Sequence, residues 1–372
     1  MMLYIHTPFC RSKCAYCDFY STPRLALTES WVDAAVAEWR ERRPEGCVPE
    51  TVYIGGGTPS ALPLKLLERL VEGLELPEEL REFTVEVNPD DVTPEGAAGI
   101  HAVMSRHTRQ PRVSMGVQSL DDDLLRFIGR RHTAAGAVGA YGMLREAGFT
   151  NISLDLIYGL PGETLDSWER SLRGVLDLRP EHLSAYLLSY EPRTRLGVML
   201  AQGKVEEASE SLATEMYGIL CRETRGAGYG HYEISNFALP GRRAIHNSGY
   251  WAGEEYIGIG PGAHSYSGGV RGSVPPNLTE YIRRGGKGLF EPEEESDENR
   301  YNDLIITSLR TADGLDPRRL DIFPERITDA FRDSVSPLLA SGDIVLTDEG
   351  RYAIPESRWL TSDAIFLKLI IV

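Results

Sequence analysis

Apolar and β-branched residues in the first half of the chain occur as short runs, separated by longer segments in which apolar residues recur at helical spacing. The runs that predict buried strands are 3–6, 51–54, 83–87, 112–117, 152–157 and 182–188. Between two of these runs, Trp31, Ala35 and Trp39 give a helix one apolar face. Strands that alternate with amphipathic helices predict a parallel sheet with right-handed crossovers, which is either a barrel or an open doubly wound sheet.

The pattern changes near residue 229, and the chain that follows is rich in glycine and aromatic residues, so we expect mainly loops there. A domain boundary is expected between the Gly/Pro-rich stretch at 274–276 and the acidic run at 291–298. Residues 1–285 and 286–372 are therefore predicted to form two domains.

The second predicted domain begins with apolar residues at helical spacing. Two short candidate strands, 344–346 and 352–354, follow on either side of a turn. Helices followed by a hairpin predict a small α+β domain of the winged-helix type.

Polar and glycine-rich segments follow the predicted strands at the ends where parallel sheets carry their functional groups. They are the cysteine-rich loop after the first strand and 55–60, 88–90, 118–119 and 158–162 after the next four. Because the carboxyl ends of parallel strands meet at one edge, we expect a single rim to collect all of these segments.

The composition of the 372-residue chain is that of a globular protein, with 42% hydrophobic and 25% charged residues. Lys and Arg (39) minus Asp and Glu (55) leave a net charge of −16, which argues against nucleic acid as a partner. No apolar run approaches the length of a membrane-spanning helix, and the first residues lack the basic and apolar segments of a signal peptide. We therefore expect a cytoplasmic protein without a transmembrane segment, while peripheral membrane contact stays open.

Three of the five cysteines, Cys10, Cys14 and Cys17, are crowded together, which in a reducing compartment indicates metal or redox chemistry. Their C-x3-C-x2-C spacing supplies thiolates for three irons of a cubane cluster and leaves the fourth iron without a local protein ligand. The alternative is a zinc site of the Cys3His type that uses His6, but structural zinc sites generally use two separated ligand pairs, and a second pair is missing. We therefore expect an iron–sulfur cluster with one open iron.

The run 10–17, with an aromatic residue before its last cysteine, resembles the signature of the radical S-adenosylmethionine (SAM) superfamily. The resemblance implies an incomplete (β/α)6 TIM-like barrel of the radical SAM type, with a [4Fe-4S] cluster on the three clustered cysteines. It also implies that the amino and carboxylate groups of SAM chelate the open iron. An electron from the reduced cluster then breaks a carbon–sulfur bond to give a 5'-deoxyadenosyl radical, so an electron donor for the cluster is an expected partner.

Further positions match SAM-binding motifs of this superfamily and of its coproporphyrinogen-oxidase-like branch. By resemblance, the glycine-rich loop receives the SAM amino group, and Arg130, twelve residues after Gln118, pairs with the SAM carboxylate. The positions implied to contact SAM are Tyr4, Tyr16, Gly56, Gly57, Thr58, Glu86, Gln118, Arg130, Asp155 and Ser189. When each residue is considered on its own, the glycines are also explained by a tight turn, and the polar residues are also explained by a solvated face.

Longer strings, including YIHTPFC, YIGGGTPS, RVSMGVQS, DLIYGLPGET, YEISNFA and HNSGYW, resemble the HemW-type heme chaperones, relatives of the oxygen-independent coproporphyrinogen III oxidases. The resemblance implies that the chain binds heme and delivers it to acceptor hemoproteins such as respiratory enzymes.

Two other functions stay open beside the chaperone. The first is the oxidase itself, which decarboxylates the propionates of coproporphyrinogen III. The oxidase carries a fourth cysteine two residues after the third, where this chain has Phe19, so we favour the chaperone. The second is an iron–sulfur protein with an unrelated substrate. Neither a catalytic residue nor SAM turnover is assigned.

The string HNSGYW at 246–251 is similar to the motif associated with heme handling in HemW-type proteins. Imidazole is a common axial ligand of heme iron, and aromatic rings stack on a flat macrocycle. The heme-binding residues implied by the resemblance are His246, Asn247, Tyr250 and Trp251, with a merely packed loop as the alternative. The axial ligand stays open, because three further candidates are His264, His231 and Cys221.

Two groups of residues are given no functional role from the sequence. His101, His107 and His132 are expected at the solvated surface. Cys47 and Cys221 stand alone in the sequence and, apart from the question of the heme ligand, are treated as ordinary residues.

Overall fold

The computed structural model describes residues 1–371, and its centre is a twelve-stranded sheet. Six parallel strands lie next to one another in chain order within this sheet: β1 (Met2–Thr7), β2 (Thr51–Gly56), β3 (Glu82–Val87), β4 (Pro111–Gln118), β5 (Asn151–Tyr158) and β6 (His182–Leu187). The two end strands of the sheet do not pair with each other within the described chain, so the barrel is incomplete. The six strands predicted from the sequence are confirmed.

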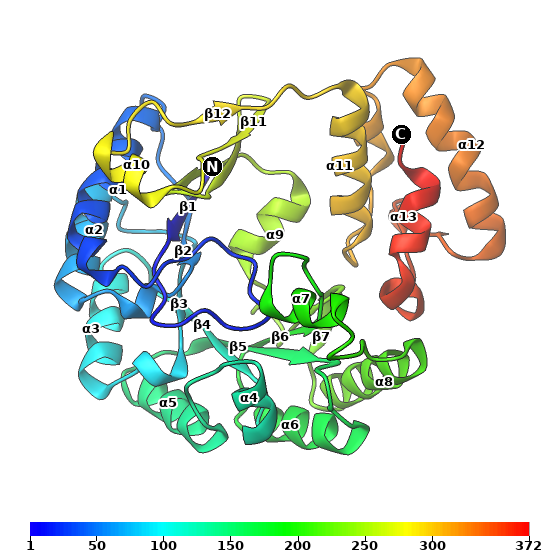
Figure 1. The fold of residues 1–372 in the computed structure, drawn as a ribbon. Coiled ribbons are helices and arrows are strands. Elements are labelled where there is room, and N and C mark those ends of the chain that lie inside the picture. Colours follow the sequence, from blue (N-terminus) through cyan, green and yellow to red (C-terminus); the bar gives the residue numbers. More distant parts are fainter. Residues whose placement is uncertain (372) are drawn as a thin grey trace.

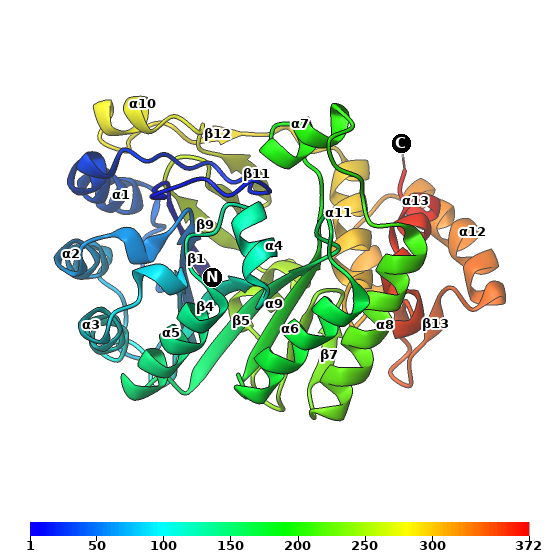
Figure 2. The ribbon, with the colours of Figure 1, turned by 60° about the horizontal axis from the view of Figure 1, so that its bottom comes forward.

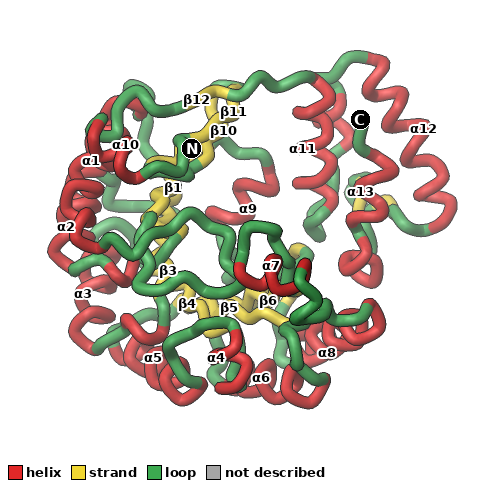
Figure 3. The backbone as a smooth tube through the Cα atoms, in the orientation of Figure 1, coloured by secondary structure: helices red, strands yellow, loops and turns green. Residues whose placement is uncertain are grey.

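Helices follow the six strands and lie outside the sheet, as Figures 1 and 3 show. They are α1 (Thr28–Arg42), α2 (Leu64–Leu74), α3 (Pro94–Met104), the short α4 (Asp122–Phe127), α5 (Ala134–Glu146) and α6 (Leu165–Asp177). Their leucines explain the packing, since Leu67, Leu70 and Leu74 of α2 recur on one side of the helix and are buried against the strands. The prediction of an incomplete (β/α)6 barrel is thus confirmed.

The chain after β6 contains more regular structure than the sequence predicts. Its elements are α7 (Arg195–Ala201), α8 (Glu210–Gly226), β7 (Gly230–Glu233), β8 (Asn236–Ala238), α9 (Ile245–Ala252), β9 (Tyr256–Ile259), β10 (His264–Ser267), β11 (Val270–Ser273), α10 (Leu278–Arg283) and β12 (Glu291–Pro292). The expectation of mainly loops after residue 229 is wrong, because strands this short, separated by glycine turns, show no clear periodicity.

These added strands extend the sheet at both ends. β8 pairs antiparallel with β6 and carries β7 beyond it. At the other end, β9 pairs parallel with β1, and β10, β11 and β12 follow as antiparallel strands. The sheet therefore curves around its interior further than six strands alone would allow.

The C-terminal part is helical with a small hairpin. It contains α11 (Asp297–Leu309), the 3₁₀ helix η4 (Pro317–Leu320), α12 (Glu325–Ser341), β13 (Val345–Leu346), β14 (Tyr352–Ala353), the 3₁₀ helix η5 (Glu356–Thr361) and α13 (Asp363–Leu369). The hairpin of β13 and β14 lies where the sequence predicts two strands. Figure 2 shows α11, α12 and α13 beside the barrel, and one hydrophobic core continues from the barrel into them.

The helices of residues 1–371 include none that is both long and apolar enough to cross a membrane.

The expectation that His132 lies at the solvated surface is wrong. Its ring is buried, and its Nε2 lies 3.0 Å from the carbonyl oxygen of Val117. Burial lowers the pKa of His132 to about 4, so the ring is neutral. The neighbours of His132 in the sequence are polar, so the sequence indicates an exposed position. In the fold, the side chain is instead buried against the carboxyl end of β4.

Candidate functional site

The loop after β1 carries the three clustered cysteines across the carboxyl end of the barrel, and it is drawn in dark blue in Figure 1. Backbone hydrogen bonds fasten this loop at both ends. The amide of Cys10 donates to the carbonyl of Thr22 at 3.1 Å, and the amide of Ala15 donates to the carbonyl of Ile128 at 2.8 Å. The loop is therefore positioned by the barrel before any cofactor binds.

The donor set of this loop fits an iron–sulfur cluster. Cys10, Cys14 and Cys17 are half-buried free thiols, and burial raises the pKa of Cys17 to about 11. Cys10 Sγ lies 3.1 Å from Thr58 Oγ1, and Cys14 Sγ lies 3.5 Å from the guanidinium of Arg130. Within residues 1–371 the three thiols do not converge on one point as the ligands of a single ion do. A four-iron cluster needs no such convergence, because each cysteine binds a different iron.

The geometry of His6 argues against the zinc alternative. Its Nδ1 lies 3.1 Å from the Tyr4 hydroxyl, and its Nε2 lies 2.9 Å from the carbonyl oxygen of Tyr20. Both ring nitrogens are thus engaged in hydrogen bonds, and the ring is buried in the barrel wall. His6 therefore supports the cysteine loop and does not complete a fourth ligand position.

The glycine-rich loop after β2 requires its glycines. Gly56 has a φ of 99°, which favours glycine, and a Cβ at Gly57 would lie 2.6 Å from the carbonyl oxygen of Thr7. Thr58, the next residue, is buried and faces the cysteine loop. The loop therefore brings bare backbone to the edge of the cysteine loop, as the SAM amino acid moiety would require.

Glu86 supplies a carboxylate beside this glycine loop. Its carboxylate accepts hydrogen bonds from the Tyr53 hydroxyl at 2.7 Å and from the Gly56 amide at 3.2 Å. Burial raises the pKa of Glu86 to about 7, and the nearby Asp155 adds to the effect. Since Glu86 has no ion-pair partner within 4.0 Å among the described residues, a cationic group of a ligand would satisfy it.

Arg130 supplies a complementary positive charge beside the thiol of Cys14. Its guanidinium donates to Asn88 Oδ1 at 2.8 Å and to the carbonyl oxygen of Gly116. No carboxylate of residues 1–371 pairs with Arg130, which leaves its charge for an anionic ligand group. Gln118, whose amide lies beside Gly116, has a φ of 67°, and such strain is typical of functional sites. Glu86 thus offers a hydrogen-bond acceptor for an amino group, and Arg130 offers a cation for a carboxylate, as an amino acid moiety requires.

The remaining predicted SAM contacts differ in whether they lie at the barrel. Asp155 accepts hydrogen bonds from Ser114 on the neighbouring strand, and Tyr16 packs beside the cysteines near Arg130. Ser189 lies exposed beyond β6, and its hydroxyl donates to Glu191 at 2.7 Å. The structure thus brings every predicted SAM residue except Ser189 to the barrel interior or its rim.

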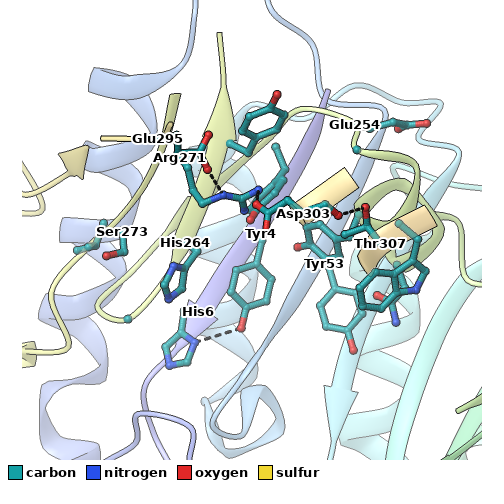
Figure 4. Close-up of a pocket in the computed structure, with 18 of the residues that line it drawn as sticks. Tyr4, His6, Tyr53, Glu254, His264, Arg271, Ser273, Glu295, Asp303 and Thr307 are labelled. Atoms are coloured by element: carbon teal, nitrogen blue, oxygen red, sulfur yellow. Dashed lines mark hydrogen bonds and ion pairs between the residues drawn. The ribbon is translucent and has the colours of Figure 1, made fainter. Parts of the chain in front are cut away.

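A cavity of about 1290 Å³ opens between the barrel and the C-terminal part. Tyr4 and Tyr53 from β1 and β2 line it together with Asp303 and Thr307 from α11, and Figure 4 labels all four. Phe19, next to the cysteines, also lines the cavity and is 65% exposed. The cavity therefore connects the neighbourhood of the predicted cluster with a wall that the C-terminal part contributes.

The string HNSGYW forms α9, and the helix divides its residues between two environments. Asn247, Tyr250 and Trp251 line the cavity. His246 is fully buried against the barrel, with Nδ1 2.8 Å from Thr51 Oγ1 and Nε2 2.9 Å from the Tyr250 hydroxyl. Burial lowers the pKa of His246 to about 3. The imidazole is therefore a neutral structural group that holds α9 against β2.

His264 is placed differently from His246. It is the first residue of β10, is exposed, lines the cavity and makes no side-chain hydrogen bond with any other residue of 1–371. Figure 4 shows its ring next to His6. The other two candidate ligands from the sequence, His231 and Cys221, do not line this cavity.

The sequence analysis misses a set of cations that the tertiary structure gathers around the cavity. Lys13, Arg193 and Arg319 line it, and none of them has a carboxylate partner among the described residues. They come from the cysteine loop, the segment after β6 and η4, so no local pattern connects them. Their common feature is a positive charge without a carboxylate partner in a cavity that carboxylates such as Asp18 and Glu254 also line, inside a chain whose overall charge is −16.

Comparisons with known proteins identify the superfamily and family of the chain. A family model described as the Radical SAM superfamily matches residues 4–174. The coproporphyrinogen III oxidase HemN from Escherichia coli, a radical SAM enzyme of known structure, matches with a TM-score of 0.82 over 99% of this chain and 89% of that chain. At 22% sequence identity this is a likeness of fold alone. The cysteine loop, the glycine loop and the partial barrel together define a radical SAM protein.

The curated relatives narrow the class. The chain is 34% identical to the heme chaperone HemW of Bacillus subtilis (strain 168) over 374 residues, which cover 98% of this chain and 97% of the relative. It is 38% identical to HemW of Lactococcus lactis subsp. lactis (strain IL1403) over 276 residues, 72% of this chain and 70% of the relative. The chain belongs to the HemW family of heme chaperones within the radical SAM superfamily.

Proposed function

We propose that the protein binds heme in the cavity between its barrel and its C-terminal part and delivers that heme to acceptor hemoproteins. The observation that carries the proposal is the cavity itself. Its volume of about 1290 Å³ exceeds the roughly 300–1,000 Å³ of ordinary small-molecule sites, and aromatic rings and cations line it. A porphyrin needs both features, because its macrocycle is a flat apolar plate and its propionates are anions.

The cavity-lining residues of α9 suit the face of a macrocycle. Tyr250 and Trp251 bring aromatic rings to the wall, and the guanidinium of Arg310 lies 3.9 Å from the ring centre of Trp251. This contact fixes the Trp251 ring in one orientation, while His246 fixes the Tyr250 hydroxyl. In this proposal the histidine of HNSGYW holds the aromatic residues in position and does not itself bind iron.

His264 is the residue we propose as the axial ligand of the heme iron. An axial ligand needs a free ring nitrogen that points into the heme site. His264 offers such a nitrogen in the cavity, whereas His246 and His6 have both nitrogens engaged.

The cluster and SAM occupy the rim of the barrel in this proposal. Cys10, Cys14 and Cys17 would hold the [4Fe-4S] cluster, while Glu86 and Arg130 would orient the amino acid moiety of SAM. When bound, the reduced cluster supplies an electron to SAM, so an electron donor is a required partner. Gly57 would let SAM approach the backbone. The partial burial of the three cysteines would limit the access of water to their sulfur atoms.

The proposed acceptors are hemoproteins such as respiratory enzymes, and the proposed location is the cytoplasm. Two relatives of this chain carry names that agree with heme delivery, the HemW chaperones of Bacillus subtilis and Lactococcus lactis. The runner-up, oxidation of coproporphyrinogen III, is disfavoured because Phe19 occupies the position of the fourth cysteine that the oxidase carries.

An anaerobic reconstitution separates these functions. The protein is loaded with iron and sulfide and given either heme, or coproporphyrinogen III with SAM and a reductant. We expect retention of one heme per chain after gel filtration, transfer of that heme to an apo-hemoprotein, and no vinyl-bearing porphyrinogen. Formation of that product over many turnovers would establish the oxidase in place of the chaperone.

Three histidine variants test the ligand. His264→Ala should shift the Soret band and weaken heme binding about tenfold or more, with an unchanged Tm, because the ring supports no other group. His246→Ala should lower Tm, since it leaves Thr51 Oγ1 and the Tyr250 hydroxyl without their partner. His101→Ala, outside the cavity, is the control. An unchanged Soret band in His264→Ala would exclude His264 as the axial ligand. The proposal that the protein delivers heme would still stand.

A further inference from the structure

A second cluster of metal-ligating side chains lies outside the proposed heme and SAM sites. It consists of Cys221 on α8, His231 on β7 and Glu356 on η5. One ligand atom from each residue lies within 4.8 Å of the other two, and all three residues are partly buried. None of them lines the large cavity, so the cluster is separate from the site described above.

The hydrogen bonds of His231 leave two acceptor atoms facing each other at this cluster. Its Nε2 lies 3.2 Å from the carbonyl oxygen of Ile234, which can only accept, so the ring proton belongs on Nε2. Nδ1 then presents its lone pair to a Glu356 carboxylate oxygen only 2.9 Å away. Two acceptors at this distance repel each other unless a proton or a metal cation lies between them.

Aromatic side chains hold the His231 ring in place. The ring stacks on Phe237, with ring centres 4.0 Å apart, and meets the edge of Trp359 at 4.4 Å. The ring is therefore held in one orientation, with its Nδ1 directed at the carboxylate and the thiol.

The position of the Cys221 thiol favours a metal site over a catalytic relay. Its Sγ lies 4.0 Å from His231 Nδ1, the same nitrogen that faces Glu356. In a nucleophile–base–carboxylate relay the thiol and the carboxylate would occupy opposite ring nitrogens. Here sulfur, nitrogen and oxygen all converge on one point, which is the arrangement that a shared cation requires.

We propose that Cys221, His231 and Glu356 form a zinc site that joins the barrel to the C-terminal part. Zinc accepts thiolate, imidazole and carboxylate ligands, and its bond lengths set the ligand atoms about 3.3–3.6 Å apart. The separations of 2.9 Å and 4.0 Å lie on either side of this range, so small rotations of Glu356 and Cys221 bring all three into place. The buried Tyr217 hydroxyl lies beside the thiol and can donate a hydrogen bond to the Cys221 sulfur.

The position of the site gives zinc a structural task. Arg225 of α8 already donates to the second carboxylate oxygen of Glu356 on η5 at 2.6 Å. Nearby, the backbone amide of Ala312 donates to the carbonyl of Tyr232 at 2.9 Å. A zinc ion here would add a strong bond to this seam and fix the C-terminal wall of the cavity, which includes Arg319.

Zinc content and zinc-dependent stability test the site in protein whose iron–sulfur cluster has been reconstituted, so that Cys10, Cys14 and Cys17 are occupied. We expect one zinc per chain by elemental analysis after dialysis against Zn²⁺ and gel filtration, and a Tm that rises with Zn²⁺. Cys221→Ser and Glu356→Gln should each lower zinc affinity at least tenfold and remove the rise in Tm.

Two controls match these variants. Cys47→Ser removes the other lone half-buried cysteine and should keep the zinc. Arg225→Ala breaks the ion pair to Glu356 without removing a zinc ligand and should also keep it. Equal zinc content in wild type and Glu356→Gln, or wild type without zinc, would overturn the proposal and leave a protonated His231–Glu356 pair at the seam.

Discussion

Glu86 shows how a single side chain acquires its property from its surroundings. In the sequence it is one polar residue near the end of a strand, and a solvated position explains it equally well. In the fold its carboxylate lies beside the glycine loop without a cationic partner, so burial raises its pKa to about 7. The charge of this group therefore changes near neutral pH.

This charge change predicts a pH dependence of SAM binding. Glu86 is mostly protonated below pH 7 and charged above it, and an amino group that donates a hydrogen bond to it favours the charged form. SAM affinity, measured by calorimetry on cluster-loaded protein, should therefore rise between pH 6 and pH 8. Glu86→Gln should weaken binding at pH 8 about tenfold, the effect of a charge-assisted hydrogen bond, and should flatten the pH profile.

Glu79→Gln is the matched control for this prediction, because Glu79 is exposed and pairs only with Arg109 at the surface. Its SAM affinity should follow that of the wild type at every pH. If Glu86→Gln keeps the wild-type pH profile, Glu86 does not contact SAM.

At the scale of an element, the loop after β2 works because its backbone is bare. Gly57→Ala would place a Cβ 2.6 Å from the carbonyl oxygen of Thr7 and 2.7 Å from that of Phe9, and backbone atoms cannot rotate away. We expect a loss of about 1–3 kcal/mol in the free energy of unfolding, the usual cost of overpacking. The cysteine loop should shift, and the iron content after reconstitution should fall.

Gly142→Ala separates this effect from that of any new methyl group. Gly142 lies within α5, and a Cβ there meets nothing within 4 Å. This variant should gain about 0.5–1 kcal/mol because alanine favours the helix. Urea denaturation and iron analysis of both variants give the comparison, and equal behaviour would show that the glycine loop tolerates side chains.

The elements also show where periodicity succeeds and where it fails. β1 to β6 are largely buried, and in β3, β4 and β5 apolar residues alternate with polar ones, so these strands show a period of two in the sequence. β7 to β11 are three or four residues long and are framed by glycines with positive φ, such as Gly260 and Gly262. Runs so short carry too few residues to reveal a period, and the two strands that join the barrel, β8 and β9, pair with β6 and β1, which lie far away in the sequence.

The whole molecule sets the electrostatic contrast on which heme binding depends. A chain with a net charge of −16 repels the two propionates of heme over most of its surface. Inside the cavity, Lys13, Arg193 and Arg319 face the ligand without carboxylate partners in residues 1–371. We therefore expect the cavity to select an anionic porphyrin.

Arg319→Ala tests this contrast. Loss of one charge-assisted contact should weaken the binding of heme about tenfold. The affinity for heme dimethyl ester, which has no free carboxylate, should be the same in Arg319→Ala and wild type. Heme titrations followed by absorbance measure both ligands.

Arg109→Ala is the control for charge alone, because Arg109 is 92% exposed and does not line the cavity. It should leave both affinities unchanged. An equal loss for heme and for its dimethyl ester in Arg319→Ala would show that Arg319 shapes the wall and does not bind propionate.

The order of residues was sufficient to predict a parallel sheet, the cysteine loop and the glycine loop, because each depends on neighbours along the chain. The resemblance to the radical SAM superfamily then implied the partial barrel. Apolar runs mark strands, C-x3-C-x2-C marks three thiols on one loop, and Phe19 marks the missing fourth cysteine. Strand ends that meet at one rim then place Glu86 and Arg130 near the thiols.

The roles of the other residues depend on contacts between distant segments, which only the tertiary structure shows. His246 looks like a ligand in the string HNSGYW, yet Thr51, almost two hundred residues away, turns its ring into the wall. Cys221 looks like an ordinary residue until β7 and η5 bring His231 and Glu356 to it. Packing decides these roles, because a side chain's hydrogen bonds, burial and charge partners come from whichever segments the fold brings against it.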